Sequence, residues 1–209
     1  MTKKIETEKC CVVAGDMQLS ETYWNNQYDA LTTGWDLGQV SPPLKAYIDQ
    51  IEDKNLRILI PGCGNTYEAG YLLQQGFANF TVIDIAPTLV KDLKNKFSGN
   101  KNINIILGDF FNHTGEYDLI LEQTFFCAIN PPLRKSYVAK MNDLLTIKGK
   151  LAGVLFDKEF EHQGPPFGGS KSQYTLLFEN WFVLKTFEPC YNSFTKRQGT
   201  ELFIIFSKK

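Results

Sequence analysis

The feature that most constrains the fold of this chain is an alternation of short apolar runs with helix-like segments. Five runs have the length and aliphatic composition of buried strands, at 57–61, 80–84, 103–107, 117–121 and 150–156. Helically spaced apolar residues separate most of them, at 66–75, 88–97 and 133–145. Strands that alternate with helices predict an α/β fold, with a parallel sheet covered by helices on both faces.

The pattern changes near the end of the chain. Two further strand-like runs, 181–188 and 201–207, are joined by residues 188–199, which contain Pro, Asn, Ser and Gly and show no helical period. A parallel connection normally needs a helical crossover, so we expect the last strand to be antiparallel. Five strand–helix units followed by a hairpin differ from the standard dinucleotide-binding sheet. They match the seven-stranded, Rossmann-like sheet of class I methyltransferases.

The residues before the first strand predict a helical cap. Ser20 can begin a helix that carries Trp24, Tyr28 and Leu31 on one face, and a Gly-rich turn leads to a second amphipathic helix. We expect residues 1–209 to form one domain, in which residues 19–54 are the cap that covers the cofactor. Residues 1–18 are a poor match to a signal peptide, and we expect them to be disordered.

Bulk composition narrows the function classes. A net charge of -1 gives no electrostatic reason to expect nucleic acid or an anionic membrane as partner. No apolar run approaches the roughly 18 residues of a membrane span. The five cysteines, without Cys-x-x-Cys, favour reduced thiols in a cytoplasm. The two histidines have no partner at metal-ligand spacing, so we expect no metal, and nothing demands more than a monomer.

Residues 56–76, LRILIPGCGNTYEAGYLLQQG, place a glycine loop between a strand and a helix. Gly62 and Gly64 let the backbone turn sharply and approach a ligand with no Cβ in the way. Asn65 and Glu68 have the spacing of a capping box at the helix N-terminus. Such a strand-to-helix turn predicts a small-molecule site.

Three positions discriminate between cofactors for this loop. The dinucleotide fingerprint needs glycine where this chain has Tyr67, and no phosphate loop is present. Asp84 ends the second strand, where a carboxylate can accept hydrogen bonds from ribose hydroxyls of NAD and S-adenosylmethionine alike. Asp109, beside Phe110, can accept from an adenine amino group. Together these residues favour S-adenosylmethionine over the alternative of a NAD-dependent oxidoreductase, although both acids can also cap helices or turns.

Longer segments resemble the thiopurine S-methyltransferase family, and within it the thiol and halide methyltransferase branch. They are YWNNQY, GWDLGQVSPPL, IPGCGNTYEA, VIDIAPT, GDFF, EQTFFCAINPPLRKSYV, HQGPPFGGS and RQGTELFIIF. The resemblance implies transfer of a methyl group from S-adenosylmethionine to a small soft nucleophile by in-line displacement. Within the family the acceptor is a thiol or hydrosulfide, a halide or thiocyanate, or a thiopurine or other aromatic thiol.

The resemblance also implies roles for the cap aromatics. Trp24, Tyr28 and Trp35 match positions that close over the cofactor, where an aromatic face beside a sulfonium contributes about 0.5–2 kcal/mol. Spacing alone would place Trp24 and Tyr28 in the core. Glu122 falls at the carboxyl end of the fourth strand, the usual ligand crevice of such sheets. The full set of expected cofactor contacts is Trp24, Tyr28, Trp35, Gly62, Gly64, Asp84, Asp109, Phe110 and Glu122.

The expected acceptor pocket lies further along the chain. Phe125 and Phe126 can form an apolar wall, or belong to the core. Arg134 matches a family arginine near the acceptor, where a cation can favour a thiolate; the alternative is a helix-surface arginine. The Gly- and Pro-rich segment 162–170 is expected to be a lid, with Pro165, Pro166 and Phe167 lining the pocket.

Several other features admit competing interpretations. His162 can act as a general base in the lid, but a lone loop histidine is usually exposed. Asn130-Pro131-Pro132-Leu133 resembles an amino-methylation motif, yet it follows the strand end by several residues and lacks the aromatic. Asn130 as a helix cap with Pro131 in the first turn explains it better. Cys63 and Cys127 are interpreted as packing residues. A non-catalytic S-adenosylmethionine-binding module remains an alternative.

Overall fold

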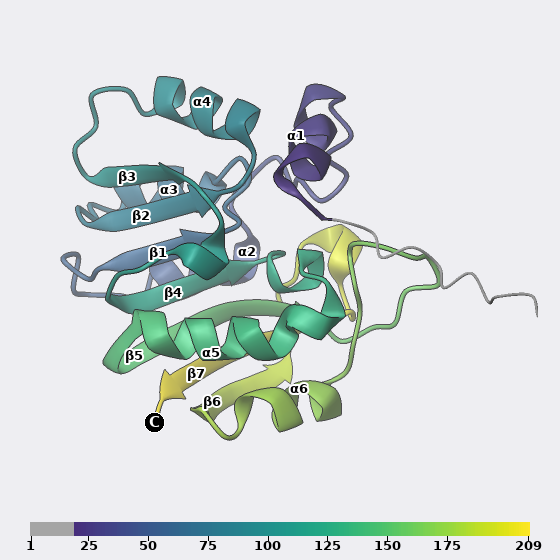
Figure 1. Ribbon diagram of the computed structural model, residues 1–209. Helices are drawn as coiled ribbons and strands as arrows, with labels where there is room; N and C mark the ends of the chain where they lie inside the picture. Colours follow the sequence, from purple (N-terminus) through teal and green to yellow (C-terminus); the bar gives the residue numbers. More distant parts are fainter. Residues whose placement is uncertain (1–18) are drawn as a thin grey trace, which may run out of the picture.

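The structure is a computed structural model that describes residues 19–209, so the expectation for residues 1–18 lies outside the described residues (Figure 1). Seven strands form one sheet in the order β3-β2-β1-β4-β5-β7-β6. Their bounds are β1 Ile58–Pro61, β2 Phe80–Asp84, β3 Ile103–Leu107, β4 Tyr117–Gln123, β5 Leu145–Phe156, β6 Phe182–Pro189 and β7 Glu201–Lys208. β7 pairs antiparallel with β5 and with β6, whereas the other pairs are parallel. The prediction of a mostly parallel sheet with a reversed last strand is confirmed.

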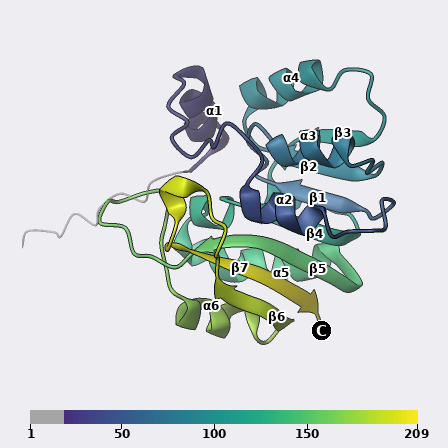
Figure 2. The same cartoon turned by 180° about the vertical axis from the view of Figure 1, so that it is seen from behind.

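Helices cover both faces of the sheet. They are α2 Pro42–Ile48, α3 Tyr67–Gln74, α4 Pro87–Lys96, α5 Arg134–Leu144 and α6 Lys171–Phe178. The further helix α1 Glu21–Asp29 lies beside α4 and not on a face of the sheet (Figure 1). Short 3-10 turns are η1 Phe110–Asn112, η2 Phe126–Ala128, η3 Pro131–Leu133 and η4 Thr195–Arg197. Figure 1 shows α5 and α6 in front of the sheet, and Figure 2 brings α2 and α3 to the front.

The strands divide their side chains between two apolar clusters. Leu119 and Leu121 of β4 pack with the helices α2, α3 and α4, whereas Ile120 between them packs with α5 and α6. This alternation follows from the period of two in an extended strand. The sheet is therefore buried on both faces and presents its ends to solvent.

The carboxyl ends of the parallel strands define the functional edge of the sheet. β7 starts at this same edge, because Glu201 pairs with Phe156, the last residue of β5. The connection from β6 to β7, which contains η4, therefore lies beside the loops that follow β1, β2, β4 and β5. The cap helix α1 is attached nearby, where Asn25 Oδ1 accepts a hydrogen bond of 2.8 Å from the Thr88 backbone N–H at the start of α4.

Two local predictions need correction. The capping box at Asn65 and Glu68 is wrong, because the N-cap of α3 is Thr66, at φ +44°, without a side-chain cap bond. Glu68 instead accepts the Ser41 backbone N–H at 2.9 Å, a contact made by the incoming cap segment. A helix that was not predicted spans 171–178, where Ser170 forms a capping box with Gln173.

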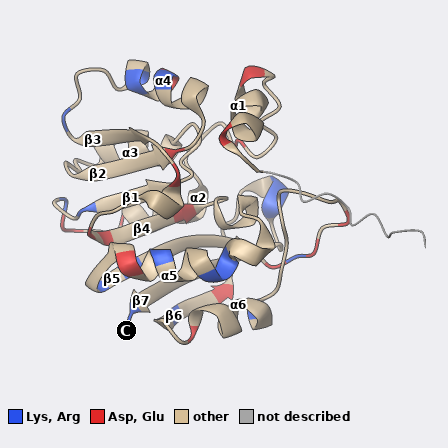
Figure 3. Ribbon diagram, in the orientation of Figure 1, with Lys and Arg blue, Asp and Glu red and all other residues tan. Residues whose placement is uncertain are grey.

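Charge is spread over the elements that the structure describes. Acidic and basic residues are interspersed along them (Figure 3), in keeping with the net charge of -1. Within residues 19–209, no helix is long and apolar enough to cross a membrane. The same part of the chain contains no cluster of three or more His, Cys, Asp or Glu side chains suited to a metal ion.

Candidate active site

A cavity of about 1240 Å³ lies at the carboxyl edge of the sheet. The cap, the glycine loop, the ends of β2 and β4, the segment after β3, the loop after β5 and η4 all contribute to its wall. The predicted site residues that line it are Trp24, Tyr28, Trp35, Gly62, Gly64, Asp84, Asp109, Phe110, Phe125 and Pro166. The structure therefore brings most of the predicted set together around one space.

The glycine loop forms one wall of this cavity. Gly62 and Gly64 both adopt left-handed conformations, with φ values of +53° and +52°. A Cβ on Gly62 would lie 2.1 Å from Cδ2 of Phe125, so the ring packs directly on the bare backbone. The conformational freedom of glycine is thus required here both by the turn and by the close approach of Phe125.

Asp84 supports the loop and faces the cavity. Its Oδ2 accepts the Gly64 N–H at 3.1 Å, and its Oδ1 accepts the Ala86 N–H at 3.0 Å. Burial raises the pKa of Asp84, while these hydrogen bonds act in the opposite direction. A carboxylate has about four lone-pair sites, so Asp84 keeps acceptor capacity for a ligand hydroxyl.

Asp109 caps a 3-10 turn and also lines the cavity. Its carboxylate accepts hydrogen bonds from Phe111 N–H at 2.8 Å and from Asn112 Nδ2 at 3.2 Å, which caps η1. It also lines the cavity beside Phe110, whose ring packs 5.1 Å from that of Phe125. The cap role accounts for these hydrogen bonds, and contact with an adenine remains a prediction.

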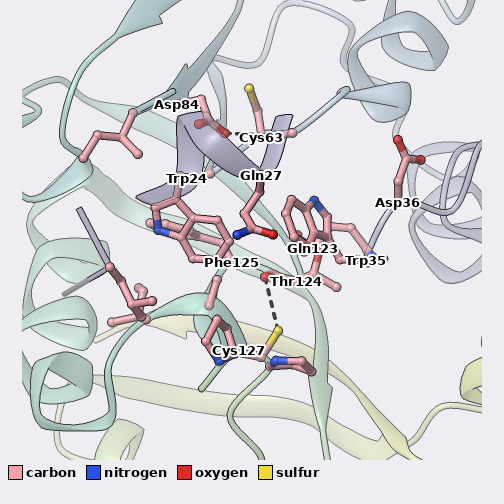
Figure 4. A pocket seen from close by; sticks show the side chains of 18 of the residues that line it. Trp24, Gln27, Trp35, Asp36, Cys63, Asp84, Gln123, Thr124, Phe125 and Cys127 are labelled. Atoms are coloured by element: carbon pink, nitrogen blue, oxygen red, sulfur yellow. Dashed lines mark hydrogen bonds between the residues drawn. The ribbon is translucent and has the colours of Figure 1, made fainter. Parts of the chain in front are cut away.

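Three cap aromatics pack edge-to-face against one another over the cavity. The ring centroids of Trp24 and Trp35 are 5.5 Å apart, and those of Tyr28 and Trp35 are 5.8 Å apart. Figure 4 shows Trp24, Gln27 and Trp35 between Cys63 and Asp84 at the top and Cys127 at the bottom. Trp24 and Tyr28 are half-buried and also pack against the core cluster. Each side chain therefore contacts both the core and the cavity.

The cap is tied to the site by polar contacts from distant segments. Arg197 in η4 donates from Nη2 to the Trp35 backbone oxygen at 2.8 Å. Asp36 accepts hydrogen bonds from the Asn65 side-chain amide and, at 3.2 Å, from the Tyr67 hydroxyl. Residues of the glycine loop, of α3 and of the C-terminal hairpin thus hold the cap over the cavity.

Arg197 is the functional residue that the sequence analysis missed. It is the one Lys or Arg among the residues described as lining the cavity. Its Nη1 lies 3.5 Å from Glu201 Oε1, and its guanidinium lies over the Phe156 ring. The segment 197–206 carried the family resemblance, but nothing in its local pattern indicated that a hairpin residue would face the ligand.

Two buried polar atoms in the cavity wall have no protein partner within the described chain. They are Thr66 Oγ1, at the start of α3, and Gln123 Oε1, at the end of β4. Buried polar groups in proteins are almost always hydrogen-bonded, so each atom is suited to a polar group of a ligand. A nucleoside-containing ligand with an amino acid tail offers such groups, and the residues present fit S-adenosylmethionine.

Glu122 does not match the expectation of a cofactor contact. It is fully buried outside the cavity, and its Oε1 accepts the N–H groups of Phe125 and Phe126 at 2.7 and 2.9 Å. Its Oε2 accepts the Tyr137 hydroxyl at 2.5 Å. Burial raises the pKa of Glu122 to about 7. Glu122 therefore shapes the loop after β4, and the neighbouring Gln123 faces the cavity instead.

Three predicted acceptor residues also lie outside the cavity. Phe126 is buried in the core, with its ring 5.0 Å from that of Tyr137. Arg134 donates to backbone oxygens of the loop after β5, and Phe167 in that loop donates its N–H to the Cys127 oxygen at 2.7 Å. The core alternative for Phe126 is confirmed, and neither Arg134 nor Phe167 contacts the ligand space.

The remaining candidates have modest roles. His162 lines the cavity from an exposed position. Cys63 and Cys127 also line the cavity; burial raises both thiol pKa values, that of Cys127 to about 12, which fits packing residues. Asn130 precedes η3 rather than α5, with Pro131 in the first turn of η3, and its side chain makes no cap bond.

Comparison with known proteins places this site in a family. Residues 19–202 match the thiopurine S-methyltransferase (TPMT) family. The chain is 31% identical over 156 residues to "Probable thiol methyltransferase 2" of Arabidopsis thaliana, covering 72% of this chain and 69% of that protein. It is 26% identical over 192 residues to a thiopurine S-methyltransferase of Acinetobacter baylyi, covering 80% and 87%. It is 25% identical over 190 residues to "Thiocyanate methyltransferase 1" of Brassica oleracea, covering 88% and 83%.

Solved structures agree on the fold. A Burkholderia thailandensis 1,6-didemethyltoxoflavin-N1-methyltransferase with bound S-adenosylhomocysteine aligns with a TM-score of 0.72 at 15% identity, covering 90% of this chain and 87% of that one. Fold and site define a class I, S-adenosylmethionine-dependent methyltransferase. Its relatives act on small-molecule acceptors. The chain belongs to the thiopurine S-methyltransferase family and is a methyltransferase of the thiol and thiopurine type. Membership of this family rules out the nicotinamide-dependent alternative.

Proposed function

We propose that this enzyme methylates a small soft nucleophile, namely a thiol or hydrosulfide, or an anion such as thiocyanate or a halide. The observation that carries this proposal is the position of Arg197. It is the one Lys or Arg described in the cavity wall, where its guanidinium lies over the Phe156 ring, bonds the Trp35 oxygen and pairs with Glu201 at 3.5 Å. A guanidinium held at the cavity wall attracts a compact anion or a thiolate.

The glycine-loop side is proposed to hold the cofactor. S-adenosylmethionine, when bound, supplies a methyl group activated by a positively charged sulfonium. The backbone at Gly62 and Gly64 offers close approach, and Asp84 offers acceptors for ribose hydroxyls. Trp24 and Trp35 present aromatic rings to a cation. In place of Glu122, we assign Gln123 and Thr66 as additional polar contacts.

The acceptor side needs little acid–base chemistry. A free thiol has a pKa of about 8.5, so part of it is thiolate at neutral pH, and the Arg197 guanidinium would increase that fraction. A cofactor and an acceptor bound beneath the cap would displace water from the cavity, which strengthens the attraction between Arg197 and an anion. Holding two reactants in line can contribute about 7–11 kcal/mol to lowering a barrier. No dedicated base is required.

An aromatic thiol, such as a thiopurine, is the second candidate acceptor. The cavity volume of about 1240 Å³ exceeds the roughly 300–1,000 Å³ of typical small-ligand pockets. Such a volume leaves room beside the cofactor for a ring, and the Phe125 side chain offers it an apolar wall.

The decisive experiment measures S-adenosylhomocysteine formation with hydrosulfide, thiocyanate, iodide, an aryl thiol and a thiopurine offered separately. Turnover of the small anions and hydrosulfide supports the first proposal, whereas turnover of the ring compounds alone supports the second. Lack of turnover with all five, in a protein that binds S-adenosylhomocysteine by calorimetry, would contradict both.

A further inference from the structure

The loop after β5 is closed at its base. This loop, residues 157–170, is called the acceptor loop below. Lys158 and Gly169 form an isolated antiparallel bridge, in which Gly169 N–H donates to the Lys158 oxygen at 3.0 Å. Asp157 Oδ1 accepts the Lys171 N–H at 2.9 Å. These contacts pin the two ends together and leave the middle of the loop to be held by other means.

The middle of the acceptor loop reaches the cavity. Pro165 and Pro166 line the cavity, and so does His162. The next residue, Phe167, donates its N–H to the Cys127 oxygen, so the loop is attached to the segment after β4. That segment supplies Cys127 and its neighbours to the same wall. The shape of the wall therefore depends on how the acceptor loop sits on this segment.

Arg134 of α5 also binds the acceptor loop, at the two residues that follow Pro166. Its Nη2 donates to the Phe167 oxygen at 3.1 Å and to the Gly168 oxygen at 2.9 Å. One guanidinium group thus bridges two consecutive carbonyls immediately after Pro166. A Cβ on Gly168 would lie 1.9 Å from the Lys158 oxygen, so the backbone is packed tightly at this point.

Loop carbonyls are the hydrogen-bond partners of Arg134 Nη2, whereas its buried Nε has no partner within the described residues. The residue is 8% exposed, and its guanidinium lies 4.5 Å from the Phe126 ring centroid and 5.8 Å from that of Tyr174. No ion pair links it to a carboxylate in residues 19–209. Because Arg134 does not line the cavity, its charge is not presented to the acceptor.

We propose that Arg134 is a positioning residue that locks the acceptor loop so that Pro165 and Pro166 complete the acceptor wall, without itself touching the acceptor. The assignment of this wall to the acceptor rests on the proposed function; the locking of the loop does not. Lysine is a poor substitute, because its ammonium group could donate to the two carbonyls but lacks the flat guanidinium that lies over the Phe126 ring.

The test compares Arg134→Lys with Lys135→Met, which removes a neighbouring exposed cation from the same turn of α5. Limited proteolysis with a Glu-specific protease reports on the loop at Glu159 and Glu161, independently of activity. We expect at least tenfold faster cleavage in Arg134→Lys and no change in Lys135→Met. If Arg134→Lys does not fold, Arg134→Met takes its place in the test. Methionine keeps an apolar side chain packed against Phe126 but cannot donate to the loop carbonyls.

Kinetics give a second readout. For Arg134→Lys we expect KM to rise at least tenfold. The factor should be the same for a neutral acceptor and for anionic thiocyanate. The affinity for S-adenosylhomocysteine should stay within twofold of wild type. Unchanged proteolysis would overturn the inference. So would a loss confined to anionic acceptors, because it would assign Arg134 to the acceptor charge. If wild type methylates none of the acceptors, the proposed function fails, and proteolysis still decides the role of Arg134.

Discussion

Arg197 and Trp35 lie 162 positions apart in the sequence, yet the Arg197 guanidinium donates a hydrogen bond of 2.8 Å to the Trp35 backbone oxygen. This bond joins the C-terminal hairpin to the cap at the wall of the cavity. It gives Arg197 two roles, as an anchor of the cap and as the cation of the cavity wall.

Replacing Arg197 should therefore affect both ligands. A hydrogen bond to a charged group contributes roughly 1.5–3 kcal/mol, so Arg197→Met should weaken S-adenosylhomocysteine binding about tenfold. It should also raise KM for thiocyanate more than for a neutral thiol. Calorimetry and steady-state kinetics measure the two effects. Lys196→Met, which removes an exposed cation next to it, is the control and should change neither. Equal KM increases for both acceptors would remove Arg197 from the acceptor site.

Asp84 should be needed for cofactor binding. Asp84→Ala removes an acceptor from the cavity and leaves the N–H groups of Gly64 and Ala86 without their partner. At roughly 1.5–3 kcal/mol for a charge-assisted bond, affinity should fall at least about tenfold. Asp84→Asn keeps one oxygen and should lose less. Calorimetry with S-adenosylhomocysteine measures both variants, and wild-type affinity in a folded Asp84→Ala protein would exclude the assigned role.

Gly62 should be far less tolerant of alanine than Gly76. Both glycines have positive φ, +53° and +82°, and each alanine would cost about 1–2 kcal/mol of backbone strain. Only at Gly62 would the new Cβ overlap the Phe125 ring, since nothing lies within 4 Å at Gly76. We expect Gly62→Ala alone to abolish measurable cofactor binding.

A second substitution separates strain from overlap at Gly62. Adding Phe125→Ala to Gly62→Ala removes the overlapping ring and should recover part of the binding lost in the single variant. Thermal unfolding and calorimetry on the single and double variants provide the comparison. If Gly62→Ala and Gly76→Ala are equally impaired, backbone strain alone explains the effect.

Glu122 should make stability depend on pH. Burial raises its pKa from 4.5 to about 7, so between these values the native state holds a proton that the unfolded state has lost. This contribution to the free energy of unfolding is complete below about pH 4.5 and is lost as pH rises through 7. Glu122→Gln can still accept the two loop N–H groups but does not titrate. Its Tm relative to wild type should rise between pH 5 and pH 8; a constant difference would contradict the assignment.

Strand positions were predictable because they depend on local patterns. The run 80–84 coincides with β2, since a buried strand in a parallel sheet is largely apolar, and the run 103–107 coincides with the edge strand β3. The direction of a side chain at a strand end was harder to predict from the sequence. Glu122 and Gln123 are adjacent in β4, so their side chains point to opposite sides, Glu122 into the core and Gln123 into the cavity. The sequence does not reveal which of the two faces the cavity.

Contacts between distant segments explain the other errors. Glu68 has the spacing of a capping box, but Ser41 from the cap segment takes its carboxylate. Arg134 lies on α5 where the family resemblance places a cation, yet the acceptor loop covers it. Arg197 comes from a hairpin whose reversal brings it to the cavity. In each case the deciding partner lies more than 25 residues away in the sequence.

The reversal of β7 also determines how this enzyme can be handled. β7 begins beside the cavity at Glu201 and runs antiparallel to β5 (Figure 1). Its last residue, Lys208, therefore lies at the opposite end of the sheet from the cavity. A surface or fusion partner attached behind Lys208 would therefore face away from the mouth of the cavity. Immobilisation at that end should leave ligand exchange unhindered.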